Sequence, residues 1–364
     1  HVLLQFGQRL LHAFVLDMAG PVDEERVLPL GLVRGPRPDP STADAVAEET
    51  PEAHDGLGIA LWWLNEITAS HHHRALAYRG FRQNGTPGRA ARIACWLARE
   101  QVFLSSNFPA MHGWFRRAEQ LLAGTEPSIE RAWFFLMRAS LTAAPDEMAP
   151  IAAAAVSSAR DSGSGDLEAF GLAFYGQALV ALGSVDEGMA RLDEAMAMAT
   201  GGEVADLTII SEIFCVMLST CEMAGDLARS DVWCRNALDF AQRYSCPFLL
   251  AYCRTSYGGL MMALGRWRDA EAALLEAVAA FGRGHKGLQP HAVIKLADQR
   301  ATQGRVEEAE VILAGLEDQA AAAIPRARLH LAKGEPALAR AVLEQSLSGS
   351  ATPTLHQLPV LFLL

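Results

Sequence analysis

Hydrophobic and polar positions follow a helical period along most of the chain, and the pattern is clearest between Leu249 and Phe281. Apolar residues recur there at spacings of three and four in two segments, which predicts two amphipathic helices. Gly265 lies between the segments, and glycine readily adopts the left-handed conformation that often ends a helix. Gly258 and Ala270 are small, so we expect the two helices to cross closely at these positions.

The same arrangement returns at other turns of the chain. Turns are expected at glycines spaced by about 40 residues, with a shorter last unit: Gly183, Gly225, Gly265, Gly304 and Gly334. Small residues recur seven positions before these turns and five and twelve positions after them: Gly176, Ala195, Ala237, Ala309 and Ala339. We therefore predict an all-α fold, an α-solenoid of stacked antiparallel helix hairpins that resembles the tetratricopeptide repeat. An irregular helical bundle is the alternative.

The sequence predicts three regions of different character. Residues 1–19 are expected to form a short amphipathic helix, and residues 20–50 contain several prolines that are typical of a linker. The repeat domain is expected over residues 51–364. In its first two hairpins, Asn65 and Ser106 are expected to take the place of the turn glycine.

The last ten residues, 355–364, form an apolar run without a polar face. A terminal repeat normally ends in a polar capping helix, since its outer face has no neighbour. We expect this run either to fold back over the last hairpin or to cover the same surface of a second molecule. We favour the homodimer, because a two-fold pairing covers both apolar surfaces at once.

Composition and charge restrict the classes of partner. The formal net charge is −11, which disfavours direct nucleic-acid binding by this chain. The amino-terminal segment is interrupted by polar residues, so we expect no membrane association. No cysteine pair has a redox or metal-binding spacing, which favours reduced, buried thiols in a cytoplasmic protein. The cysteines are Cys95, Cys215, Cys221, Cys234, Cys246 and Cys253.

The consecutive histidines His71, His72 and His73 are the most conspicuous candidates for chemistry. Successive helical residues point about 100° apart, so three neighbours on one helix cannot all face one metal ion. The HExxH pattern and the common nucleotide-binding and hydrolase motifs are absent. We expect a binding protein without catalytic residues or cofactor. The alternative is a hydrolase that uses zinc or another divalent metal at His71–His73, with Glu66 or His112 contributing.

A solenoid of this kind has a concave surface lined mainly by the first helix of each hairpin. Residues 13, 10 and 6 positions before each turn are expected to face this concave surface. Their side chains are aromatic, small or acidic, which favours a small apolar ligand or a peptide or protein partner. The candidate ligand-binding residues from these positions are Phe170, Gln177, Tyr252 and Thr255. Three tryptophans near the amino-terminal end are further candidates: Trp62, Trp63 and Trp96. Inter-repeat core is the alternative role for the larger of these side chains.

Several phrases outside the general repeat pattern resemble the helical-repeat region of large LuxR-type transcriptional regulators of actinobacteria. They are ALWWLNE, ARIACWLARE, HGWFRRAEQLLAG and the stretches 283–310 and 327–347. The resemblance covers about residues 50–364 and implies a sensor or scaffold module that binds an inducer or a partner protein. Such regulators also contain nucleotide-binding and helix-turn-helix domains. No P-loop precedes Thr50 and no helix-turn-helix follows Leu364 in this sequence, so we expect neither activity from this chain.

Overall fold

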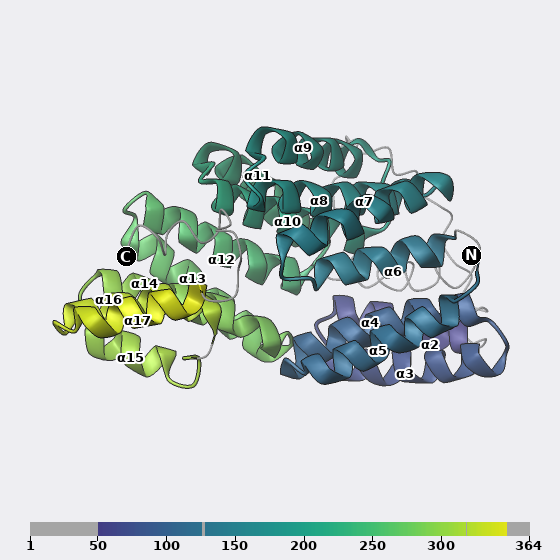
Figure 1. Ribbon diagram of the computed structural model, residues 1–364, viewed down its shortest axis with the longest axis horizontal. Helices are drawn as coiled ribbons and strands as arrows, with labels where there is room; N and C mark the ends of the chain where they lie inside the picture. The colour runs from purple at the N-terminus through teal and green to yellow at the C-terminus, as the bar shows by residue number, and fades with distance from the viewer. Residues whose placement is uncertain (1–49, 126–127, 318, 348–364) are drawn as a thin grey trace, which may run out of the picture. The chain divides into compact units, whose positions relative to one another are not determined.

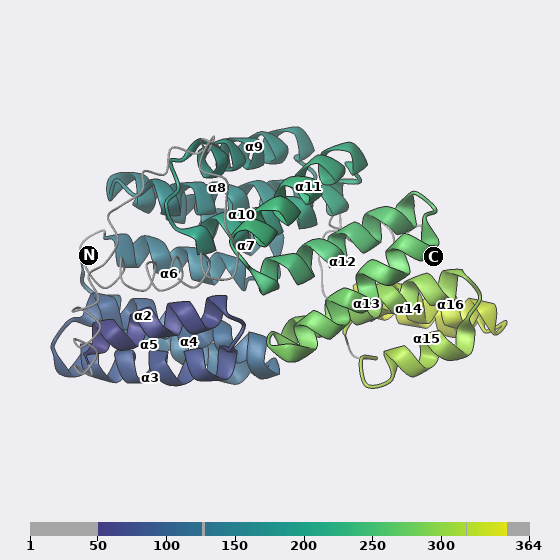
Figure 2. The same cartoon turned by 180° about the vertical axis from the view of Figure 1, so that it is seen from behind.

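The computed structural model of the protein describes residues 50–125, 128–317 and 319–347. Within these ranges the chain forms sixteen α-helices and no β-strand. Short turns connect successive helices into antiparallel hairpins, which Figures 1 and 2 show from opposite sides. The predicted all-α solenoid of stacked hairpins is confirmed. The predicted helix at 1–19, most of the linker at 20–50 and the apolar run at 355–364 lie outside the described residues.

Contacts divide the chain into two units. Among the described residues, the first contains the chain from residue 50 up to Leu141 with Ile151–Leu172 and Glu194–Ile210, and the second contains Thr142–Pro150, Ala173–Asp193 and the chain from Ser211 to residue 347. The helices up to the middle of the chain are α2 (Pro51–Trp63), α3 (Ile67–Gln83), α4 (Pro87–Ser105), α5 (Phe108–Leu122), α6 (Ile129–Ser140), α7 (Pro145–Asp161), α8 (Gly165–Ala181) and α9 (Val185–Gly201). The later helices are α10 (Leu207–Ala224), α11 (Leu227–Arg243), α12 (Pro247–Ala263), α13 (Trp267–Arg283), α14 (Gln289–Thr302), α15 (Val306–Leu313), α16 (Ala323–Ala332) and α17 (Pro336–Leu347).

The turn residues adopt the conformation that their positions predict. Gly265 has a φ of 72°, and the two residues expected to replace glycine, Asn65 and Ser106, have φ values of 67° and 52°. Both lie in the left-handed region, which asparagine tolerates better than most residues. Ser245 also has a positive φ, 49°, and precedes α12 in a turn that the glycine pattern does not mark.

The small residues of the repeat lie where the helices of a hairpin approach each other. The alanines five and twelve positions after the turns are all buried: Ala195, Ala237, Ala270, Ala277, Ala309 and Ala339. The closest approach joins α8 and α9, where a Cβ on Gly176 would lie 2.5 Å from the carbonyl oxygen of Gly188. A Cβ on Gly258 would lie 2.6 Å from Cγ of Leu274, so the residue that packs against Gly258 at the crossing is Leu274.

Helix α10 alone among the described helices is long and apolar enough to span a membrane by length and composition. Its mean hydropathy is high, but 72% of the relevant window is buried inside the protein. A core helix of a repeat protein has this character, because it packs against neighbours on several sides.

The six cysteines are free and buried. Burial raises the pKa of Cys221 and of Cys246 to about 12, and that of Cys234 to about 11. Because the thiolate is the reactive form, we expect no thiol to react with Ellman's reagent in the native protein at pH 8. All six should react after unfolding in guanidinium chloride. Rapid titration of even one native thiol would contradict the burial described here.

Candidate ligand-binding surface

Five residues that stand six positions before successive turns form a polar row in the second unit. They lie on the first helix of each hairpin, α8, α10, α12, α14 and α16, and all five are half-buried. We call this set the polar row: Gln177, Ser219, Gly259, Asp298 and Arg328. Side-chain contacts join the members at each end of the row, and an ion pair lies over Gly259 in its middle.

Ser219 joins the first three helices of the row. Nε2 of Gln177 donates a hydrogen bond to Oγ of Ser219 over 2.9 Å, and Oγ donates in turn to the carbonyl oxygen of Val216 over 2.9 Å. Burial raises the pKa of the Tyr252 phenol on α12, and the neighbouring Ser219 opposes that shift. Amide and hydroxyl groups of this kind both donate and accept hydrogen bonds, so this part of the row can serve either polarity of a peptide group.

Asp298 and Arg328 form the other end of the row. Nη1 of Arg328 lies 2.6 Å from Oδ1 of Asp298 and donates to the hydroxyl of Thr302 over 2.7 Å. Burial raises the pKa of the Asp298 carboxyl, and the neighbouring Arg328 guanidinium lowers it. The pair therefore holds one positive and one negative group at a half-buried position.

A second ion pair bridges the middle of the row. Nζ of Lys295 on α14 contacts Oε1 of Glu222 on α10, although α12 lies between these two helices in sequence. Gly259 of α12 makes the bridge feasible, because a Cβ there would lie 3.0 Å from Nζ of Lys295 and 3.3 Å from Oε1 of Glu222. The Lys295 side chain is 24% exposed and that of Glu222 is 48% exposed. We call this ion pair, with Gly259 beneath it, the clasp.

Only part of the sequence-predicted face is open. Residues ten positions before the turns are buried on the four helices α8, α10, α12 and α14, and they are Ala173, Cys215, Thr255 and Ile294. Thr255 donates its hydroxyl to the carbonyl oxygen of Ala251, one turn earlier in the same helix, over 3.0 Å. Its hydrogen bond is thus satisfied within α12, and Thr255 belongs to the core. Gln177 and Tyr252 are the two candidate residues that lie on the polar row or contact it.

The aromatic candidates of the first unit are core residues. Trp62, Trp63 and Trp96 are 1%, 3% and 4% exposed, and Phe170 is 1% exposed. The rings of Trp62 and Trp96 lie 6.0 Å apart, and Trp96 also contacts the ring of Trp133 over 5.4 Å. These large rings fill the space between neighbouring hairpins, so in this conformation they are not part of an open ligand surface.

The structure separates the three consecutive histidines. Nδ1 of His71 lies 3.0 Å from Oε2 of Glu100, whereas Nδ1 of His73 lies 3.0 Å from Nδ1 of His54 on α2. The His72 ring contacts that of His73 edge-on. Burial, together with His54 and His72, lowers the pKa of His73. In the described ranges no three His, Cys, Asp or Glu side chains come together to hold a metal ion, so the three-histidine site of the hydrolase alternative is not assembled there.

Glu100, the partner of His71, is the centre of a buried polar cluster in the first unit. Oε1 of Glu100 accepts hydrogen bonds from Nη1 of Arg74 over 2.5 Å and from Oγ of Ser70 over 2.9 Å. Burial lowers the pKa of the Arg74 guanidinium, and Glu100 opposes that effect. Arg74 also stacks over the Trp96 ring, with Cζ 4.0 Å from its centroid. The cluster joins α3 to α4 and is part of the core.

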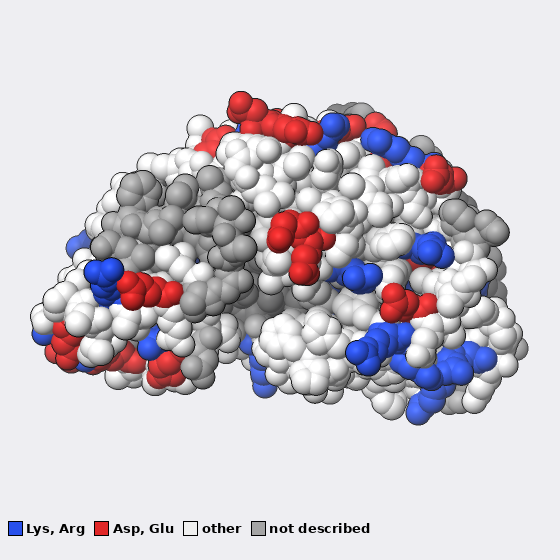
Figure 3. Space-filling model, in the orientation of Figure 1, with Lys and Arg blue, Asp and Glu red and all other residues white. Residues whose placement is uncertain are grey.

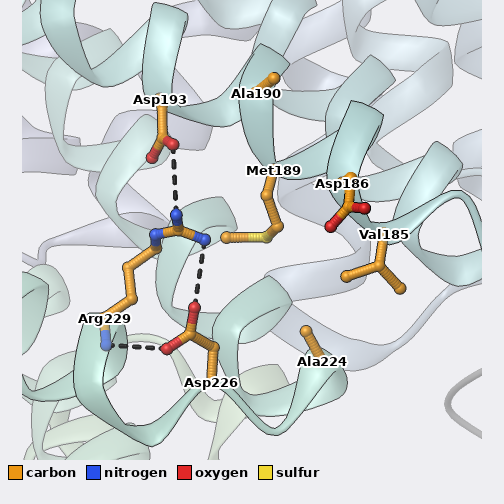
Figure 4. Close-up of a pocket in the computed structure, with 8 residues that line it drawn as sticks. All are labelled: Val185, Asp186, Met189, Ala190, Asp193, Ala224, Asp226 and Arg229. Carbon is orange, nitrogen blue, oxygen red and sulfur yellow. Dashed lines mark hydrogen bonds and ion pairs between the residues drawn. The ribbon is translucent and has the colours of Figure 1, made fainter.

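A hollow of about 400 Å³ lies beside the turns of two hairpins in the second unit. Figure 4 shows Arg229 reaching across it toward Asp193 of α9, with Nη2 3.3 Å from Oδ2. Asp226 holds the same guanidinium at 3.1 Å and caps the start of α11 by accepting from the Arg229 amide. The hollow is lined by residues of two hairpins only, whereas the polar row extends over five, which makes the hollow a weaker candidate for an extended ligand.

Charged side chains are unevenly distributed over the surface in Figure 3. Basic side chains gather over helices α2–α5, at the lower right, and acidic ones lie along α9 at the upper edge. Four exposed arginines contribute to the basic character of α3 and α5: Arg79, Arg82, Arg116 and Arg117. The polar row, by contrast, contains both signs of charge.

Comparison with known proteins identifies a shared fold. No protein-family model and no curated protein matches the sequence. Among solved structures, the crystal structure of Rap protein complexed with competence and sporulation factor is similar to this chain, with a TM-score of 0.54 and 13% identity. The match covers 93% of this chain and 87% of that chain. At this identity the similarity shows that the two proteins share an all-α helical-repeat architecture.

Proposed function

We propose that the protein is a peptide-binding module and that the peptide lies along the polar row of the second unit. The observation that carries this proposal is the hydrogen bond between Gln177 and Ser219 on the first helices of two successive hairpins, with Tyr252 of the third next to Ser219. A polar row offers more to the amide groups of a peptide than to the apolar small molecule that the sequence also suggested.

The spacing of the helices indicates the length of the peptide. Packed helices lie about 8–10 Å apart, and an extended chain advances about 3.3–3.6 Å per residue. Each helix would therefore meet a peptide group about every three residues, and the five helices of the row would accommodate about twelve residues.

Two observations support the proposal from outside the row. The similar Rap protein was crystallised in complex with competence and sporulation factor, so the shared fold can hold a ligand. The sequence segments that resemble LuxR-type regulators suggest that peptide binding would control a transcriptional response. We propose on this basis that the chain is a cytoplasmic sensor module of such a regulator, and its buried free thiols are consistent with a reducing compartment.

Selection from a displayed library of random peptides, each about twelve residues long to match the row, tests the proposal. The selected peptides should bind the wild-type protein and lose about tenfold or more in affinity for Ser219→Ala/Arg328→Ala, since each lost hydrogen bond costs about 0.5–1.5 kcal/mol. Arg235→Ala is the control, because Arg235 is exposed on the second helix α11 and pairs only with Asp231 one turn away. If no peptide is selected, or if the double variant binds like the wild type, the polar row is not a peptide site.

A further inference from the structure

We infer that the clasp is a recognition site for a carboxylate of the bound peptide, which replaces Glu222 as the partner of Lys295. This assignment rests on the proposed function. It concerns a residue pair that lies beside the polar row and touches its central member, Gly259. The pair is the one place on the row where a cation is held by a carboxylate that is itself about half exposed.

The surroundings of Lys295 leave it available to a ligand. Arg328, the other cation of the row, is held by Asp298 and by the hydroxyl of Thr302. Lys295 has Glu222 as its ion-pair partner, and the exposed His291 lies one helical turn before it on α14. The carboxylate that holds Lys295 is 48% exposed, against 22% for the one that holds Arg328, so a ligand carboxylate can displace Glu222 more readily than Asp298.

Gly259 supplies the space that the exchange requires. Any side chain at this position would meet Nζ of Lys295 and Oε1 of Glu222, so a bulkier residue would occupy the place where a ligand carboxylate must enter. With glycine, the floor beneath the clasp is backbone of α12. A ligand carboxylate can therefore reach Lys295 when the Glu222 side chain rotates away into solvent.

The exchange favours the ligand because of how each carboxylate is held. An exposed ion pair contributes little, since two flexible side chains must be ordered to form it. A peptide that is already fixed by Gln177, Ser219 and Tyr252 presents its carboxylate at high effective concentration. Glu222 then competes with the ligand for Lys295. A ligand without a carboxylate would break the Lys295–Glu222 ion pair without forming a new one, so it is disfavoured.

A mixed pool of random peptides, about twelve residues long and without Asp or Glu, provides the test. The pool contains three sets of peptides, and each set has its own isotope label. The first set has a free carboxy-terminus, the second has an amidated carboxy-terminus, and the third has an amidated carboxy-terminus and a single internal Asp. After gel filtration with the protein, mass spectrometry measures the retained fraction of each set. We expect the carboxylate-bearing sets to be enriched about tenfold over the plain amide, as for a charge-assisted hydrogen bond. The first and third sets distinguish a terminal from a side-chain carboxylate.

Variants of the clasp separate this inference from a purely structural ion pair. Lys295→Met should remove the preference for carboxylates but retain the amidated peptides, and Glu222→Gln should increase the preference by removing the competitor. Lys333→Met is the matched control, because Lys333 forms a similar exposed ion pair with Glu310 away from the row. Equal retention of all three sets by the wild type would overturn the carboxylate site and leave peptide binding intact. Retention of none would overturn the proposed function and this inference together.

Discussion

Replacing Glu100 by alanine is expected to lower the free energy of unfolding by about 3–5 kcal/mol, because it leaves a buried charge without its partner. Both members of the pair are inaccessible, since the side chains of Arg74 and Glu100 are 1% and 0% exposed. His71 would lose its carboxylate partner in the same change, whereas Ser70 would keep the carbonyl oxygen of Gly58 as an acceptor at 2.7 Å. Urea unfolding followed by tryptophan fluorescence measures the effect, because five of the seven tryptophans lie in the first unit.

The matched control is an exposed pair between neighbouring helices of the same unit. Arg89 and Glu52 contact each other at 2.5 Å, but their side chains are 56% and 40% exposed. Glu52→Ala should therefore change stability by about 1 kcal/mol or less. If Glu100→Ala and Glu52→Ala unfold at the same urea concentration, the Arg74–Glu100 pair is not buried as described.

The second large effect is expected at the crossing of α8 and α9. Gly176→Ala should destabilise the protein by about 1–3 kcal/mol, although alanine is the better helix former by about 1 kcal/mol. The added Cβ would lie 2.5 Å from the Gly188 carbonyl oxygen and 3.0 Å from Cγ of Leu192. The nearest obstacle is backbone, which cannot rotate away as a side-chain end can. Thermal unfolding followed by circular dichroism measures the loss.

Gly113 provides the control for this substitution. It lies inside α5, and nothing stands within 4 Å of the place where its Cβ would be. Gly113→Ala should therefore stabilise the protein by up to about 1 kcal/mol through helix propensity. Opposite signs for Gly113→Ala and Gly176→Ala would show that packing at the crossing decides the outcome. Stabilisation by both would mean that α8 and α9 are farther apart than described.

The repeat could be predicted from the sequence because its signal is local and recurs. Each turn needs a residue that tolerates positive φ, and each crossing needs a small one. Residues equivalent to Gly265 and Ala277 therefore recur in several hairpins, although Leu316 and Ser346 stand at the Ala277 position after Gly304 and Gly334. Asn65 and Ser106 could be placed by the same logic, since their distance from Ala77 and Ala118 matches the repeat. The helix boundaries then follow from the turns.

The open face was harder to predict, because burial depends on how hairpins pack against one another. Residues ten and six positions before a turn lie about one helical turn apart and look equivalent in sequence, yet Cys215 is buried and Ser219 is half-buried. The large aromatic residues were attractive candidates, but Trp62 and Trp96 fill the space between hairpins. Glu222 and Lys295 were not among the predicted residues. They lie three positions from Ser219 and Asp298, and residues at this spacing share one face of a helix, so the same pattern could have indicated them.

The most direct test of peptide binding along the polar row is the affinity of a selected peptide for Gly259→Phe. The nearest atoms to a new side chain there are the flexible ends of Lys295 and Glu222, so the variant should fold with an unchanged melting temperature. Its ring would occupy the middle of the row. The account predicts that fluorescence anisotropy of the labelled peptide shows a loss of affinity of more than about tenfold, which corresponds to 1.4 kcal/mol, whereas Gly113→Phe on α5 binds like the wild type. Wild-type affinity in Gly259→Phe would contradict it.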